Sequence, residues 1–368
     1  MRFRPRRLLS WTAYALFLAL LAEAGARFLL MDEARLMRIG SPVSEASWRL
    51  RFVLRYARTG PAANPLEVPH RTRGWALVPG LRQVPAFAGR TVSSNAQGLR
   101  GVREHAVPKP AGTLRILAFG DSFTFGEDVS DAETYCHRLG GLLPGVEVLN
   151  FGVRGYGHDQ MLVRLREEAA RYQPDVVLLG YVTDDAIRNL SGFRDFAKPR
   201  FELAGGRLVL RGTPVPTPEE VIAAERWRPK VLDLVSMARQ NAAWRSGRRQ
   251  AEATTLTFAI LREFFREVRR LGSRPLVVDL PVWDELRVAG PAPLPREHGL
   301  EVFCRAEGLP YLRLRPLFLA HQRAGGRLET RAHWGPVEHG MAAQAIADFV
   351  RERHLLAPAE GGIEYRPE

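Results

Sequence analysis

The hydrophobic residues of the chain form short continuous runs, separated by longer segments with helical spacing. A short apolar run bounded by turn-forming residues is typical of a buried strand. Such runs lie at residues 116–119, 146–149, 175–181 and 275–280, with a weaker one at 310–314. The sequence therefore predicts five strands.

Segments with helical spacing lie between these runs. The predicted helices cover residues 133–143, 158–172, 255–271 and 341–350. In the third of them, apolar residues recur at positions i, i+3, i+4 and i+7 from Leu261, which gives the helix one apolar face. Strands that alternate with helices indicate a parallel sheet with helices on both faces, so we expect a three-layer α/β/α domain.

A different pattern interrupts this alternation at about residues 191–253. Residues 201–210 predict a β-hairpin that turns at Gly205 and Gly206, and Pro218 begins a predicted helix. Residues 223–250 then combine many arginines with Trp227 and Trp244. We expect a solvated helix pair here; binding of an anionic polymer or of lipid headgroups is the alternative.

The N-terminus has the pattern of a targeting segment. Four arginines lie within residues 1–7, and an apolar run with few charges fills residues 8–30. This run is close to the roughly 20 residues that span a bilayer. A cleaved signal peptide, with Ala24-Gly25-Ala26 as its cleavage site, is the alternative to an uncleaved anchor. We expect the anchor, and in both cases an exported domain.

Composition narrows the chemistry. The chain has 368 residues, a net charge of +13 carried mostly by arginine, and two cysteines, Cys136 and Cys304. Neither cysteine has neighbours with metal-ligand spacing, so we expect no metal site and no cofactor. A net charge of this size speaks to non-specific association, and we expect no specific nucleic-acid partner.

The most informative segment is residues 115–126, in which a predicted strand ends on Gly120-Asp121-Ser122. A serine at the carboxyl end of such a strand lies where open α/β sheets bind ligands. The wording Gly-Asp-Ser-Phe-Thr-Phe-Gly resembles the nucleophile block of the SGNH (GDSL-type) hydrolase superfamily. The resemblance implies a flavodoxin-like parallel sheet with the insertion and the N-terminal membrane helix appended.

Four further segments support this resemblance. They are residues 94–101, 150–157, 174–189 and 332–340, and they stand in the superfamily's order. The resemblance implies that Ser122 is the nucleophile and His333 its base. It also implies an oxyanion hole built from Ser122, Gly152 and the position of Asp184. The expected pocket-lining residues are Asp121, Asp185, Arg331 and Trp334.

Two positions depart from the superfamily. Asp184 stands where an asparagine amide usually donates to the oxyanion, and a carboxylate has no proton to donate there. The acidic residue expected shortly before the histidine is replaced by Thr330 and Arg331, so that Glu329 is the nearest candidate to orient the imidazole. We expect Asp184 or Asp185 to pair with Arg331 across the pocket.

The resemblance thus implies a serine esterase or O-acyltransferase that acts on an acyl ester of an envelope glycan, polysaccharide or lipid. The alternative is a catalytically degenerate member with a scaffold or glycan-binding role. We expect the protein to lie in the bacterial inner membrane, with a single membrane span and its catalytic domain in the periplasm. The sequence leaves the oligomeric state open. The predicted ranges are 1–7 cytoplasmic tail, 8–30 anchor, 31–93 linker region, 94–357 hydrolase-like domain and 358–368 tail.

Overall fold

The computed structural model describes residues 5–41, 43–60, 64–87, 89–330 and 332–357. Contacts divide the chain into two compact units. One consists of residues 1–75 and 187–256, and the other of residues 76–186 and 257–368. Each unit is described by itself below.

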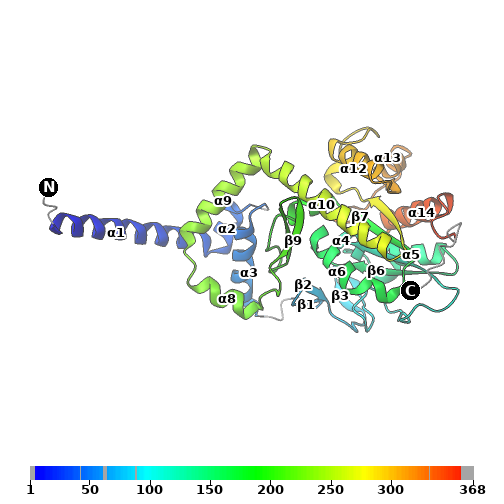
Figure 1. Ribbon diagram of the computed structural model, residues 1–368, viewed down its shortest axis with the longest axis horizontal. Coiled ribbons are helices and arrows are strands. Elements are labelled where there is room, and N and C mark those ends of the chain that lie inside the picture. Colours follow the sequence, from blue (N-terminus) through cyan, green and yellow to red (C-terminus); the bar gives the residue numbers. More distant parts are fainter. Residues whose placement is uncertain (1–4, 42, 61–63, 88, 331, 358–368) are drawn as a thin grey trace. The chain divides into compact units, whose positions relative to one another are not determined.

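The second unit contains a five-stranded sheet (Figure 1). Its strands are β5 (Leu114–Gly120), β6 (Val146–Gly152), β7 (Val176–Tyr181), β10 (Arg274–Asp279) and β11 (Tyr311–Arg313). All of them pair in parallel, in the order β11-β10-β7-β5-β6. The predicted strands and the predicted parallel α/β class are confirmed.

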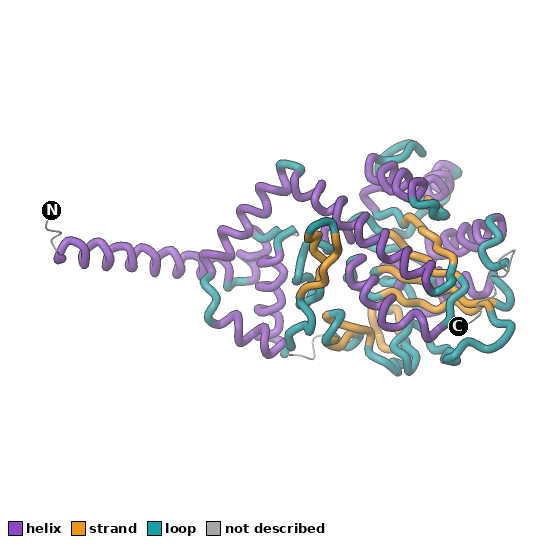
Figure 2. The backbone as a smooth tube through the Cα atoms, in the orientation of Figure 1, coloured by secondary structure: helices purple, strands orange, loops and turns teal. Residues whose placement is uncertain are grey.

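Helices pack on both faces of this sheet, as Figure 2 shows in purple around the orange strands. Side chains from one face share a core with α5 (Tyr135–Leu142), α13 (Arg315–Arg323) and α14 (Pro336–Glu352). The other face meets α6 (His158–Tyr172) and α10 (Arg248–Arg270), through ring contacts of Phe151 with Tyr172 and of Phe119 with Phe264. The helix α12 (Pro295–Ala306) packs on α10 through Phe303 and Phe258. The structure therefore has the predicted three layers.

The alternation of side chains along the strands explains why both faces are covered. Ile116 and Ala118 of β5 point to the α5 and α14 side, and Leu117 and Phe119 point to the other side. All four side chains have an exposed fraction of 0%. A strand that is apolar on both faces is stable only between two layers, which is why the apolar run alone predicted this environment.

Helix starts differ from the prediction where polar residues or proline begin the helix. The helix α14 begins at Pro336 rather than near residue 341, because proline suits the first helical turn and the Glu338 carboxylate accepts the N–H of Gly335. Short elements between the main ones were not predicted. They are α4 (Ser122–Phe125), η2 (Asp131–Glu133), α7 (Asp185–Arg188), α11 (Trp283–Leu286), β3 (Val84–Ala86) and β4 (Arg90–Val92).

The first unit is mainly helical. It contains α1 (Pro5–Leu30), α2 (Glu33–Ile39), α3 (Glu45–Thr59), α8 (Pro218–Arg226), α9 (Lys230–Arg245) and the pairs β1 (Glu67–His70) with β2 (Gly74–Leu77) and β8 (Arg200–Ala204) with β9 (Arg207–Arg211). The strands β8 and β9 are the predicted hairpin, and Gly205 and Gly206 have the positive φ that its turn requires. Residues 31–75, predicted as part of a linker, thus contain helices and strands that cluster with the insertion.

Buried ion pairs hold α3 to the insertion. The guanidinium of Arg49 lies 2.8 Å from Glu225 and 2.6 Å from Asp233, and Lys230 lies 2.9 Å from Glu225. These side chains are almost fully buried. Because breaking one partner of a buried pair leaves an uncompensated charge, this cluster fixes α3 against α8 and α9.

The helix α1 has two parts. Residues 10–30 form an apolar segment of 21 residues, long enough to cross a bilayer, and most of this segment is exposed. At its C-terminal end, Ala26 and Leu30 are buried, and Leu30 shares a small core with Leu36, Leu50 and Met237. Figure 1 shows α1 projecting as a long helix from α2 and α9.

Candidate active site

Ser122 lies at the carboxyl end of strand β5, which lies between β7 and β6 in the sheet, and it begins the single turn of α4. The turn is capped at both ends. The Asp121 carboxylate accepts the N–H of Phe123 at 3.0 Å, and Gly126 closes the turn with a φ of 86°. The neighbours β6 and β7 flank β5, so the chain leaves the sheet in opposite directions here, which is where doubly wound sheets bind ligands.

The Ser122 hydroxyl contacts the imidazole of His333. The distance from Oγ to Nε2 is 2.9 Å, although the two residues are 211 positions apart. Oγ also lies 3.3 Å from the Asp121 carboxylate. A hydroxyl has one proton, so it donates to one of these acceptors at a time, and the shorter contact to Nε2 is the one suited to proton transfer. The structure brings together the two predicted catalytic side chains.

Two carboxylates that the sequence analysis missed flank this imidazole. Asp128 Oδ2 lies 3.6 Å from Nδ1 of His333, and Glu127 Oε2 lies 3.7 Å from Nε2. Glu127 is also held by Arg154 at 2.9 Å. Asp128 has a φ of 71°, a left-handed conformation that aspartate tolerates better than most residues. The sequence signal that could have identified these carboxylates is the pair of adjacent acids just after the turn that carries Ser122.

The segment predicted at residues 94–101 braces the loop that carries these acids. Arg100 forms an ion pair with Asp131 at 2.8 Å and donates to the carbonyl of Val129 at 2.9 Å. Its guanidinium also lies 4.5 Å from the centre of the Phe125 ring. Because the Arg100 side chain is 1% exposed, these contacts hold both ends of the loop from Gly126 to Asp131.

The oxyanion donor predicted at Gly152 has another partner. Its N–H donates to the side-chain oxygen of Asn150 at 2.9 Å. A Cβ at this position would collide with the backbone of Thr124 and Phe125, so the strand end lies directly under α4. Gly155, three residues later in the loop, has a φ of 73°, and its N–H makes no hydrogen bond among the described residues. Gly155 is therefore a second candidate donor from this block.

The remaining predicted pocket residues are placed differently from one another. Trp334 has an exposed fraction of 0%, and its indole N–H donates to the Pro281 carbonyl at 2.9 Å. It packs on Phe123 and Phe318 in the core rather than lining a pocket, because its large ring fills the space under α4. Asp121 is likewise buried, as the cap of α4.

The two aspartates that were expected to pair with Arg331 differ in solvent exposure. Asp184 is exposed, and Asp185 is buried at the start of α7. Arg331 lies outside the described residues, so its pairing with either aspartate stays a prediction. The Glu329 carboxylate accepts the N–H of Val337 at 3.4 Å, at the start of α14. Its predicted place beside the imidazole is occupied by Asp128 instead.

A second histidine lies close to the site but belongs to the core. His339 has an exposed fraction of 0%, and its Nδ1 accepts the backbone N–H of Tyr135 at 3.1 Å. Burial, with Arg138 and Arg100 nearby, lowers its pKa to about 3. His339 is therefore neutral throughout the physiological range and cannot exchange protons with substrate.

A buried acidic cluster lies at the carboxyl end of β10. Asp279 is 4% exposed and accepts the phenol O–H of Tyr311 at 2.8 Å. Burial, together with the nearby Glu285 and Glu297, raises the pKa of the Asp279 carboxyl to about 7. No group of His, Cys, Asp and Glu side chains able to hold a metal ion occurs within the part of the chain that the structure describes.

This pKa predicts a pH dependence of stability. Because the folded pKa lies above the unfolded value of about 3.9, the stabilisation is complete below pH 4 and is lost as the pH rises to about 7. Linkage gives a loss on the order of 4 kcal/mol in the free energy of unfolding for one such carboxyl. We expect Asp279→Asn to remove this slope, as measured by urea unfolding of both proteins from pH 4 to pH 8. Parallel pH profiles of the two proteins would contradict the assignment.

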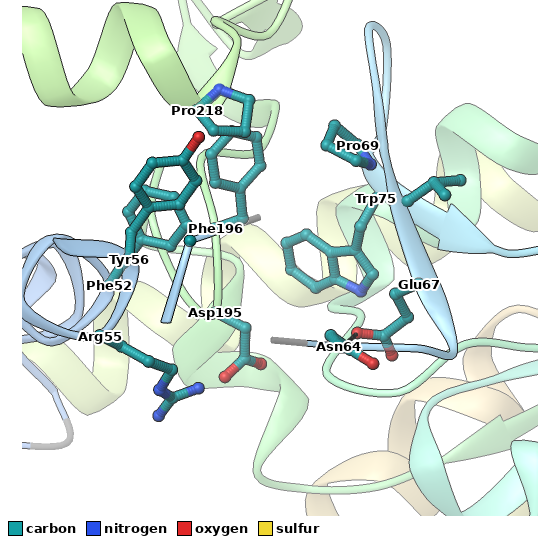
Figure 3. A pocket seen from close by; sticks show the side chains of 12 residues that line it. Phe52, Arg55, Tyr56, Asn64, Glu67, Pro69, Trp75, Asp195, Phe196 and Pro218 are labelled. Atoms are coloured by element: carbon teal, nitrogen blue, oxygen red, sulfur yellow. Dashed lines mark hydrogen bonds between the residues drawn. The ribbon is translucent and has the colours of Figure 1, made fainter. Parts of the chain in front are cut away.

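The first unit contains a separate cavity of about 170 Å³. Figure 3 shows Trp75 facing the aromatic side chains across the cavity, with polar side chains along one edge. The aromatic residues are Phe52, Tyr56 and Phe196, and the polar ones are Arg55, Asn64, Glu67 and Asp195. Aromatic walls with a few polar groups at the edge are typical of small-molecule sites. None of the residues predicted from the sequence as site residues lies in it.

The chain is similar to solved structures of a lipolytic protein of the G-D-S-L family and of esterases. A lipolytic protein of the G-D-S-L family from Veillonella parvula DSM 2008 is 12% identical, with a TM-score of 0.39, over 64% of this chain and 97% of that one. The psychrotrophic esterase EstA from Pseudoalteromonas sp. is 12% identical, with a TM-score of 0.40, over 65% and 98%. The acetylxylan esterase Axe2 from Geobacillus stearothermophilus is 15% identical, with a TM-score of 0.40, over 65% and 95%.

No curated protein matches the chain significantly. A family model does match it. The model of the GDSL-like Lipase/Acylhydrolase family covers residues 118–328, which include Ser122 and both acids that flank the imidazole, and end shortly before His333. This match covers more than half of the 368 residues. The chain therefore belongs to the GDSL-like Lipase/Acylhydrolase family.

Proposed function

We propose that the protein is a membrane-anchored serine acyl-ester hydrolase or O-acyltransferase that acts on an envelope glycan, polysaccharide or lipid. The observation that carries this proposal is the 2.9 Å contact between Ser122 Oγ and His333 Nε2 at the carboxyl end of β5. A serine hydroxyl alone is a weak nucleophile, and an adjacent neutral imidazole is the usual group that activates it.

In the first half of the reaction, Ser122 Oγ attacks the acyl carbonyl while its proton moves to Nε2 of His333. The tetrahedral oxyanion receives hydrogen bonds from the N–H groups of Ser122 and Gly155. The imidazolium then gives its proton to the alkoxide leaving group, and the acyl group remains on Oγ as an ester. No charge is left over, because the proton taken from Ser122 leaves with the alcohol.

In the second half, water or an acceptor hydroxyl attacks the acyl–serine ester. His333 removes its proton and returns a proton to Ser122 Oγ, which restores the free enzyme. Water gives the free acid, and an acceptor hydroxyl gives a new ester. The two outcomes share every protein group, so hydrolysis and transfer differ only in what reaches the acyl-enzyme.

Asp128 serves in this proposal as the positioning residue. A hydrogen bond from Nδ1–H to its carboxylate fixes the tautomer that leaves Nε2 free to accept from Ser122. The present 3.6 Å separation is longer than such a bond, and catalytic contacts commonly shorten when substrate binds. The Asp128 side chain is 43% exposed, so its contribution is smaller than that of a buried partner.

We expect Asp128→Asn to lower kcat for p-nitrophenyl acetate by about 10-fold to 100-fold with little change in KM, because the amide no longer selects one tautomer. Asp128→Glu should restore part of this loss. Nitrogen NMR of labelled histidine should show the Nδ1–H tautomer of His333 in the wild type and a mixture in Asp128→Asn.

Glu329→Gln is the matched control, because Glu329 is the acid nearest to the histidine block in the sequence and bonds a helix start instead. It should leave both kcat and the tautomer unchanged. If Glu329→Gln reproduces the effects and Asp128→Asn does not, Asp128 has no positioning role.

The substrate class rests on two features. The aromatic cavity of the first unit, with donors and acceptors along one edge, has the composition that suits a sugar ring. The apolar N-terminal helix supports a substrate at a membrane.

Addition of a hydroxyl acceptor to the purified protein separates transfer from hydrolysis. Transfer raises p-nitrophenol release without raising acetate release, and hydrolysis raises neither. A correctly folded protein that turns over no acyl ester would favour the non-catalytic scaffold.

Membrane anchoring is supported by contacts at the end of α1. Glu23 accepts backbone N–H groups at the start of α9, and Ala26 and Leu30 are buried. Cleavage after Ala26 would remove both Glu23 and Ala26 from these contacts. An uncleaved anchor therefore agrees with the fold of the first unit better than a removed signal peptide does.

We expect the N-terminus in the cytoplasm and the domain in the periplasm, because arginines precede the apolar run. An alkaline phosphatase fused to the C-terminus should be active, and the membrane-bound fusion should keep the mass of the uncleaved chain. An inactive fusion would reverse the orientation. An active fusion that lacks the first 26 residues would establish cleavage instead.

A further inference from the structure

A basic and aromatic surface lies where α8, α9 and α1 meet. It is named here the juxtamembrane patch. Its residues come from the α8–α9 turn and from the first turns of α9, which lies against α1. They are Arg226, Trp227, Leu232 and Val235. Trp227 is 79% exposed and Leu232 59%, a high exposure for such large apolar side chains.

The start of α9 is fixed to α1 by one carboxylate. Glu23 accepts the backbone N–H groups of Lys230 and Val231, each at 3.0 Å. The first N–H groups of a helix have no partner within the helix, so Glu23 serves as their cap. Glu23 is itself paired with Arg27 at 2.8 Å. The α8–α9 turn is therefore attached to α1 at the level of residue 23.

The length of α1 sets the depth of this attachment. A helix rises about 1.5 Å per residue, so Arg7 and Arg27 are separated by about 30 Å along α1. The hydrocarbon core of a bilayer is also about 30 Å thick. With Arg7 at the inner boundary, the outer boundary falls near Arg27, and Glu23 lies one turn below it. A segment attached at Glu23 then lies at the boundary between the upper acyl chains and the outer headgroup layer.

We propose that the juxtamembrane patch is seated in the outer headgroup layer of the bilayer, with Trp227 at the level of the upper acyl chains and Arg226 on anionic headgroups. The proposal rests on the anchoring role of α1 proposed above. It extends that role from a single helix to a membrane contact of the exported unit. Tryptophan is enriched at this depth, and arginine binds phosphate groups there.

The composition of the patch favours lipid over a protein partner. Arg226 lies 5.5 Å from the Trp227 ring, and Leu232 and Val235 lie on one face of α9, three residues apart. The exposed apolar side chains of the patch are scattered beside a helix that enters the bilayer, an arrangement that suits contact with lipid. A protein interface needs a continuous apolar centre instead. Insertion of α1 in the bilayer also places the patch next to lipid.

Tryptophan quenching by brominated lipids tests this inference on the full-length chain. The probe is a vesicle of phosphatidylcholine and anionic phosphatidylglycerol, brominated either near the carbonyl groups or near the methyl ends of the acyl chains. Trp227→Phe reports the patch, and Trp11→Phe reports insertion of α1. Trp244→Phe is the matched control, because Trp244 lies at the other end of α9, about 21 Å from its start.

We expect Trp227→Phe to remove a component that is quenched by bromines near the carbonyl groups, and Trp244→Phe to leave this component intact. If Trp11 is quenched and Trp227→Phe changes nothing, α1 spans the bilayer but the patch lies clear of it, and the inference fails alone. If Trp11 is not quenched by either lipid, α1 does not insert, and both the anchor and the inference fail.

Discussion

Ser122→Ala should reduce kcat/KM for p-nitrophenyl acetate by about four to six orders of magnitude, to the background rate of ester hydrolysis. The reason is that the acyl group is carried on Oγ in the proposed reaction, and no other group can form the intermediate. His333→Ala should lose a similar factor, and the double variant should lose no more than either single one, because the two side chains act as a unit.

The fold should survive this change. The Ser122 side chain makes contacts of 2.9 Å and 3.3 Å to groups that have other hydrogen-bonding capacity, so its removal should cost about 1 kcal/mol or less of unfolding free energy. Ser236→Ala is a control in the first unit and should keep full activity. Activity in Ser122→Ala that matches this control would remove Ser122 from the mechanism.

Arg315→Ala should destabilise the second unit by about 3–5 kcal/mol, the usual cost of breaking a buried ion pair. Arg315 is 1% exposed, and its Nε lies 2.9 Å from the Glu297 carboxylate, which is 3% exposed. The guanidinium also donates to the carbonyls of Val288 and Gly290, at 3.2 Å and 3.1 Å, and to that of Ala292. Its loss would leave a buried carboxylate and several carbonyls short of donors.

Arg305→Ala is the matched control, because Arg305 also pairs with a glutamate of α12, at 3.0 Å, but is 78% exposed. An exposed pair of this kind contributes about 0.5 kcal/mol or less. Urea unfolding of the three proteins compares the two sites directly. Equal stabilities of the two variants would show that the buried pair carries no more free energy than the surface pair.

The contact between Ser122 and His333 was expected from the resemblance, and the local sequence places each of the two residues. A strand that ends on Gly120-Asp121-Ser122 fixes the serine at the edge of the sheet, and the histidine block stands just before a helix start. In a parallel sheet the carboxyl ends of the strands, and the loops that follow them, lie at the same edge, so the serine and the histidine can meet there. The same reasoning gave the strands and the main helices, since an apolar run flanked by turns leaves little choice of environment.

The differences from the expected site concern groups whose partners are set by tertiary contacts. Gly152 and Gly155 occur in one block, and only the Asn150 side chain decides which N–H is already engaged. Asp128 comes from a loop held by Arg100, so its approach to His333 depends on contacts between segments far apart in the chain. Trp334 is amphipathic, and burial of its ring with one hydrogen bond to Pro281 is not visible in its spacing.

The region between residues 31 and 75 was underestimated for a similar reason. Its strands β1 and β2 have only four residues each, too few to show the period-2 pattern of half-buried strands. The buried ion pairs that hold the helix α3 to Glu225 and Asp233 join segments more than a hundred residues apart. Such pairing gives no local signal.

The central claim is that Ser122 is the nucleophile of an acyl transfer, and covalent labelling tests it most directly. The full-length protein is treated with an ethyl fluorophosphonate, and its peptides are analysed by mass spectrometry. We predict one phosphonylated residue, Ser122, with labelling that disappears in Ser122→Ala and is strongly slowed in His333→Ala. Labelling that persists unchanged in Ser122→Ala, or a folded wild type that takes up no label, would contradict the proposed mechanism.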